Sequence, residues 1–106
     1  MSKVIHGTTN VFADLGFEDA AERQTKTRLA MQIVELAKAR GGKQAEVAKT
    51  LGIPQPKVSA LMNYRLDGFS VERLMALLTA LDQDVEIFVR PSREHGKGRV
   101  TVHAVD

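Results

Sequence analysis

The feature that most constrains the fold is a pair of prolines, Pro54 and Pro56, that follow Gly52 in an otherwise helix-favouring stretch. Proline lacks an N–H and collides with the preceding helical turn, so an α-helix tolerates it only in the first turn. The prolines therefore fix the start of one helix at residue 54 or 55, and this helix is expected to end near Asn63. Gly52 ends another short helix, expected over 43–51. The sequence thus predicts two short helices joined by a tight turn.

Glycines and apolar periodicity define three further helical segments. They are expected over 10–16, from about 18 to 40, where Gly41-Gly42 ends the helix, and from Ser70, as the N-cap, to Leu81. Apolar residues that recur every three or four positions are expected to form the core. They are Leu29, Ile33, Leu36, Ala37, Val47, Ala48, Leu51, Val58, Leu61, Met62, Val71, Leu74, Leu77, Leu78 and Leu81, with Met31 and Met75 as core filler.

The apolar period changes from helical to alternating after residue 83. Alternation over 84–90 predicts a strand that carries Phe88 on one face and three aliphatic residues on the other, and 99–105 alternates again as a hairpin partner or a tail. An isolated two-stranded ribbon is marginally stable, so we expect the first strand to pair with another copy of the chain. The expected dimer interface consists of Val85, Ile87, Phe88 and Val89. The alternative for Phe88 is packing under the C-terminal tail.

These segments predict one mainly α domain, since 106 residues suffice for a single compact core. The expected organisation is a flexible arm over 1–9, a helical domain over 10–83 and a C-terminal strand or strands with a tail over 84–106. The helical domain would be a bundle of about five helices, with the helix-turn-helix at 43–63.

Composition excludes several classes of function. The absence of cysteine excludes disulfides and thiolate metal sites, and three scattered histidines lack metal-ligand spacing, so no metal and no cofactor are expected. Aromatic residues make up only 5%, which argues against a stacking platform for single-stranded nucleic acid. No paired carboxylates and no phosphate-cradling loop suggest an enzyme. No apolar run is long enough to span a membrane and no signal peptide follows Met1, so a cytoplasmic protein without a membrane partner is expected.

The formal net charge of +2 is distributed unevenly. Residues 28–65 carry seven basic and two acidic side chains, whereas both flanking regions are slightly acidic. If the basic side chains share a face, they form an electrostatic footprint for a polyanion. The alternative is an ordinary solvated surface.

The stretch 43–61 resembles the lambda-repressor-like, XRE-type family of DNA-binding domains. The resemblance rests on Gln44 at the start of the first helix, Ala48 at the helix crossing and Gly52 in the turn, and it extends over about 28–81. It implies a helix-turn-helix bundle in which the second short helix enters the major groove of double-stranded DNA. Pro54 departs from the pattern, because many relatives have Ser or Thr there, which puts any contact from that position in doubt.

A second resemblance, to HigA-like antitoxins, spans most of residues 11–91. The segments that carry it are 53–61, 65–70, 73–75 and 84–87. It implies a homodimer that represses its own operon and neutralises a RelE-like, mRNA-cleaving toxin. The toxin partner rests on this resemblance alone.

Seven polar residues are candidates for DNA contact. Side chains at the start of a recognition helix face base edges, and a glutamine amide can pair with adenine through two hydrogen bonds. A preceding helix N-terminus and side chains that follow the recognition helix suit phosphates. The expected base contacts are Gln55, Lys57 and Ser59, and the expected phosphate contacts are Lys43, Gln44, Asn63 and Arg65. Surface solvation is the alternative for each.

The function that the sequence predicts is a dimeric, sequence-specific repressor that reads an inverted repeat, as the autoregulating antitoxin of a toxin–antitoxin operon. Half-sites would lie roughly 34–36 Å apart, one turn of DNA. The alternatives are a free-standing XRE-type regulator without a toxin and a protein–protein interaction module that does not bind DNA.

Overall fold

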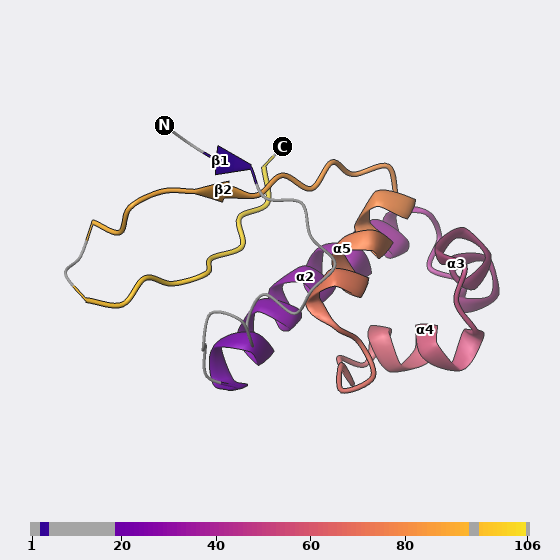
Figure 1. Cartoon of the computed structure of the whole chain (residues 1–106). Coiled ribbons are helices and arrows are strands. Elements are labelled where there is room, and N and C mark those ends of the chain that lie inside the picture. Colours follow the sequence, from indigo (N-terminus) through magenta and orange to yellow (C-terminus); the bar gives the residue numbers. More distant parts are fainter. Residues whose placement is uncertain (1–2, 5–18, 94–95, 106) are drawn as a thin grey trace.

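The computed structural model describes residues 3–4, 19–93 and 96–105, and most of this part is helical (Figure 1). The elements are β1 (Lys3–Val4), α2 (Asp19–Ala39), α3 (Gln44–Leu51), α4 (Gln55–Met62), α5 (Val71–Ala80) and β2 (Phe88–Val89). The expected bundle of about five helices therefore has four within the described residues, and the helical turn expected over 10–16 lies outside them. No helix in the described ranges is long and apolar enough to cross a membrane.

Glycine and proline set the helix boundaries as the sequence predicts. Gly41, with φ 110°, follows α2, and Gly52, with φ 68°, ends α3. Pro54 is the N-cap of α4 and Pro56 lies in its first turn. Ser70 caps α5, because its hydroxyl accepts a hydrogen bond from the Arg73 amide at 3.0 Å.

Two other helices end at residues that sequence analysis did not identify. Tyr64 follows α4 with φ 57°, and Asp82 follows α5 with φ 63°. In both cases the next amide donates to a carbonyl of the last helical turn, from Arg65 to Ala60 at 2.8 Å and from Gln83 to Leu78 at 3.1 Å. This pattern is the Schellman motif, in which glycine is the usual left-handed residue. A tyrosine and an aspartate occupy that position here.

The core lies where α2 packs against α5 and α3 packs against α4. Its largest fully buried side chains are Ile33, Val58, Leu61, Leu74, Leu77 and Leu81. Most of the expected core positions are buried, while Leu36, Ala48, Met62 and Met75 are half-buried against the cluster. Met31 is an error of the sequence analysis, since it is 44% exposed. It lies outside the α2 stripe that contains Leu29 and Ile33.

The strands differ from the expectation. β2 comprises only Phe88–Val89 rather than 84–90, and it pairs antiparallel with β1, with Lys3 opposite Val89 and Val4 opposite Phe88. Residues 99–105 form no strand, so of the two alternatives for this segment, a hairpin partner and a tail, the hairpin is not formed. Alternation predicts an extended backbone, but a ladder also requires a partner segment, and β1 offers two residues. Val85 instead packs on the helical core.

The molecule is elongated, with extents of 46 × 27 × 21 Å. In Figure 1, α3 and α4 lie at one end, α2 and α5 in the middle, and the β1–β2 ribbon at the other end. The chain after β2 runs outward and then returns, so that the C-terminus lies beside the ribbon, and Val102 packs against the core (Figure 1). The helix-turn-helix and the expected dimer strand therefore occupy different parts of the molecule.

Candidate DNA-binding interface

The second helix of the motif, α4, is anchored by one side and exposed on the other. Val58 and Leu61 have no exposed surface, so they fix α4 on the core. Gln55 and Pro56, in its first turn, are exposed. Burying two aliphatic side chains contributes about 3–6 kcal/mol. This burial holds the first turn of α4 in a defined orientation toward solvent.

The three expected base contacts do not share one face of α4. Successive helical residues are about 100° apart, so Gln55 and Ser59 lie one turn apart on one side and Lys57 lies on the other. The Lys57 ammonium donates a hydrogen bond to the Gly68 carbonyl at 3.1 Å and lies 5.0 Å from the centre of the Phe69 ring. Lys57 thus ties α4 to the α4–α5 loop, a role that the sequence did not reveal.

The N-termini of α3 and α4 differ in the backbone amides that they offer. In α4, Pro56 has no N–H and the Lys57 amide bonds to the Pro54 carbonyl at 2.9 Å, which leaves only the Gln55 amide. In α3, the first intrahelical amide bond is from Val47 to Lys43. The three preceding amides have no acceptor among the described residues, and Lys43 forms no side-chain cap. Free amides at a helix N-terminus suit a phosphate, so α3 is the better phosphate site.

Lys43 and Gln44, the phosphate candidates at α3, are exposed and half-buried respectively. Gln44 is the first residue of α3, and its side chain therefore starts beside the free amides. Glu46 follows in the same turn; its negative charge complements the helix dipole but opposes a phosphate. The backbone amides and the Lys43 charge are the favourable elements of this site.

The residues after α4 form the second candidate phosphate site. The Asn63 amide group donates to the Ser59 carbonyl at 2.8 Å, and its second N–H has no acceptor among the described residues. Arg65 is exposed, and its side chain has no ion-pair partner in the part of the chain that the structure describes. Tyr64 lies between them, 45% exposed, in the left-handed conformation. Tyr64 is not among the residues that the sequence indicates for DNA contact.

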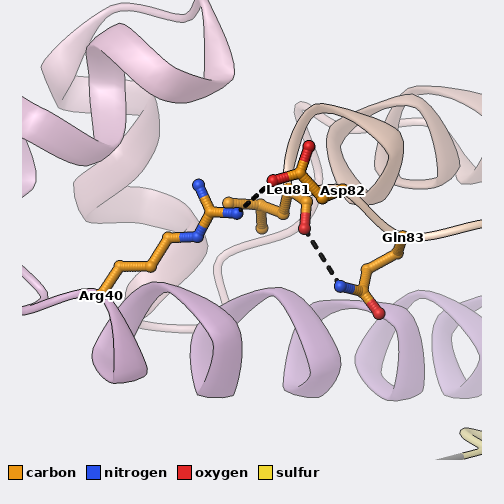
Figure 2. Close-up of polar contacts among 4 residues, drawn as sticks. All are labelled: Arg40, Leu81, Asp82 and Gln83. Atoms are coloured by element: carbon orange, nitrogen blue, oxygen red, sulfur yellow. Dashed lines mark hydrogen bonds and ion pairs between the residues drawn. The ribbon is translucent and has the colours of Figure 1, made fainter.

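One cation of the basic stretch 28–65 is neutralised within the chain. Arg40 donates to a carboxylate oxygen of Asp82 at 2.8 Å, and the Gln83 amide group bonds to the Leu81 carbonyl at 3.0 Å (Figure 2). Both partners of the ion pair are exposed, so its contribution to stability is small, about 0–1 kcal/mol. It joins the end of α2 to the end of α5 and removes Arg40 from the charge available to a polyanion.

Comparisons with known proteins agree with this architecture. A family model described as a helix-turn-helix domain matches residues 11–90. A solved structure named as an XRE-family transcriptional regulator is 55% identical in sequence, with a TM-score of 0.79; the match covers 83% of this chain and 100% of that chain. No curated protein matches the chain.

The fold is thus that of a helix-turn-helix domain, with α3 and α4 as its two defining helices. The chain belongs to the XRE-type helix-turn-helix family. This family is not one of enzymes, and the resemblance to XRE-type domains inferred from Gln44, Ala48 and Gly52 is confirmed.

Proposed function

We propose that this protein is a sequence-specific DNA-binding transcriptional repressor in which α4 is the recognition helix. The observation that carries the proposal is the first turn of α4. It projects Gln55 outward while Val58 and Leu61, with no exposed surface, anchor the helix. The structural relative named as a transcriptional regulator supports the same function.

Each half of the motif has a distinct role in this proposal. The free amides of α3, with Lys43 and Gln44, bind one phosphate, and Asn63 and Arg65 bind another beyond α4. These contacts position the protein without reading sequence. Gln55 reads a base, preferably adenine, and Ser59, one turn along the same side, adds a second polar contact.

Lys57 has a different role from the base contact that its position suggested. Its ammonium would have to leave both the Gly68 carbonyl and the Phe69 ring to reach a guanine. A charged hydrogen bond and a cation–π contact together stabilise this geometry. We therefore assign Lys57 to positioning of the α4–α5 loop, and rank it below Gln55 and Ser59 as a base contact.

The repressor acts as a homodimer on an inverted repeat, with Val85, Ile87, Phe88 and Val89 at the interface. Phe88 is 61% exposed and Val89 is 42% exposed in the single chain, although both are large apolar residues. Phe88→Asp is expected to convert the dimer to a monomer, as measured by light scattering. A Phe88→Asp variant that remains dimeric would remove Phe88 from the interface.

The antitoxin role extends this proposal on the resemblance to HigA-like antitoxins. The predicted partner is a RelE-like toxin encoded beside this protein. Co-expression with that neighbouring gene should yield a stable complex and relieve growth inhibition by the toxin. A neighbouring product that neither binds nor inhibits growth would favour the free-standing regulator.

Selection from a random duplex pool at about 150 mM salt tests the DNA-binding proposal. Enrichment of an inverted repeat with half-sites one helical turn apart is the expected result. Weak, salt-sensitive binding with no enriched sequence would instead favour the protein–protein interaction module.

A further inference from the structure

One edge of β2 faces away from β1. β1 and β2 form a two-stranded sheet, so one edge of β2 has no strand partner among the described residues. Phe88 and Val89, which point to opposite faces of the ribbon, both expose large apolar surface. Such an edge is a template for another strand, and a ribbon of two strands gains most of its stability from further pairing.

The sequence around Phe88 is complementary to itself when reversed. It reads Glu86-Ile87-Phe88-Val89-Arg90, with an acid and a base at equal distances from a central aromatic residue. In an antiparallel pair centred on Phe88, Glu86 of one copy lies opposite Arg90 of the other. Residues directly opposite each other in antiparallel strands point to the same face, where opposite charges attract.

We propose that two copies of this chain pair through β2 in that register, giving a four-stranded sheet in the order β1–β2–β2–β1 with Phe88 on the two-fold axis. The inference deepens, and rests on, the dimer of the proposed repressor. It adds Glu86 and Arg90 to the interface and fixes which residues meet.

Both faces of the resulting sheet are complementary. On one face, the two Phe88 rings meet, flanked by two ion pairs between Glu86 and Arg90. On the other face, Ile87 of each copy lies opposite Val89 of the other. A two-fold axis requires this self-complementarity, because each contact occurs twice.

The charged side chains are available for these contacts. Glu86 and Arg90 are exposed, and within the described residues neither has an ion pair or a side-chain hydrogen bond. Apart from Glu86, the acids nearest to Arg90 along the chain are Glu94, which lies outside the described residues, and Asp84, which precedes the strand; Asp82 is paired with Arg40. The neighbouring symmetric register, centred on Ile87, would place Glu86 against Phe88 and lose the pairing of Ile87 with Val89.

Charge reversal tests the register. Glu86→Arg and Arg90→Glu each convert two attractive contacts of the dimer into two repulsive ones, so each single variant should raise the dimer dissociation constant about tenfold. The double variant Glu86→Arg/Arg90→Glu restores both pairs and should dimerise like the original protein. Sedimentation equilibrium measures all four constants.

Mixing the two single variants gives a sharper result. In a heterodimer, one copy supplies two basic and the other two acidic residues, so both contacts become attractive. Native mass spectrometry of an equimolar mixture should show the heterodimer well above the statistical half. A statistical mixture would overturn the register.

Asp84→Arg is the matched control, because in this register residue 84 lies opposite Ser92 rather than a charged residue. It should leave dimerisation unchanged. A dimer weakened by Asp84→Arg but not by Glu86→Arg would overturn the proposal in favour of the register centred on Ile87. An original protein that is monomeric at high concentration would refute the dimer itself, while DNA selection would still test the recognition helix separately.

Discussion

Replacing Gln55 by alanine is the most informative perturbation of the recognition helix. Gln55 is exposed and its side chain makes no hydrogen bond to the described part of the chain. Alanine is also a better helix former than glutamine, so Gln55→Ala should leave the fold intact. A change in DNA binding then reports the contact itself.

The structure sets the size of the expected effect. Because Pro54 and Pro56 remove backbone donors from the first turn of α4, the Gln55 side chain is the main hydrogen-bonding group there. A bidentate glutamine–adenine contact discriminates by about 1–3 kcal/mol. The proposed two-fold dimer would make the contact once in each half-site, so substituting the base pair in both half-sites should cost the original protein about 2–6 kcal/mol, or roughly 30-fold to 10⁴-fold in affinity, and Gln55→Ala should lose this discrimination.

Fluorescence anisotropy measures this loss. Binding to the enriched duplex is compared with binding to duplexes that carry each of the other bases at one position, substituted in both half-sites. The original protein should discriminate at one position per half-site, and Gln55→Ala should bind all four bases there with similar affinity. Gln24→Ala, an exposed glutamine near the start of α2, is the matched control and should change nothing. An equal loss of affinity for every duplex would refute base contact and make Gln55 a backbone contact.

Three further substitutions test other parts of the account. Arg65→Ala should weaken all duplexes alike and lower the slope of log affinity against log salt by about one unit per subunit; an unchanged slope would exclude a phosphate contact. Lys57→Ala should lower the free energy of unfolding by about 0.5–1 kcal/mol in urea denaturation, since it removes the contact with Phe69, while base preference stays the same; altered preference at one base would restore Lys57 as a base contact. Gly52→Ala should lower the free energy of unfolding by about 1–2 kcal/mol, because a φ of 68° is unfavourable for a residue with a Cβ. The added Cβ would meet no other atom of the described residues within 4 Å, so an unchanged urea midpoint would contradict this backbone explanation.

The helices could be predicted from the sequence because their signals are local. Pro54 and Pro56 fix where α4 begins, Gly52 fixes where α3 ends, and the spacing of Leu74, Leu77 and Leu81 fixes the buried side of α5. Each depends on residues within one or two helical turns. The resemblance to XRE-type domains is local as well, since it rests on Gln44, Ala48 and Gly52 within ten residues.

The features that could not be predicted depend on contacts distant in sequence. β2 is two residues long because its partner, Lys3–Val4, has only two residues. That partner lies more than eighty residues earlier in the chain, so the alternation over 84–90 could not reveal it. Lys57 reaches Gly68 and Phe69 because the α4–α5 loop folds back on α4. The sequence shows that Lys57 is a cation, but it does not show which groups the Lys57 ammonium contacts.

The most direct test of the central claim is a titration of ¹⁵N-labelled protein with the enriched duplex, followed by amide chemical shifts. The largest changes are expected at the three free amides of α3, at the first turn of α4 including the Gln55 side-chain amide, and at Arg65. The amides of β2 should change little, because β2 lies at the other end of the molecule from α3 and α4 (Figure 1). Changes confined to β2, or spread evenly with none at α4, would contradict the assignment of α4 as the recognition helix.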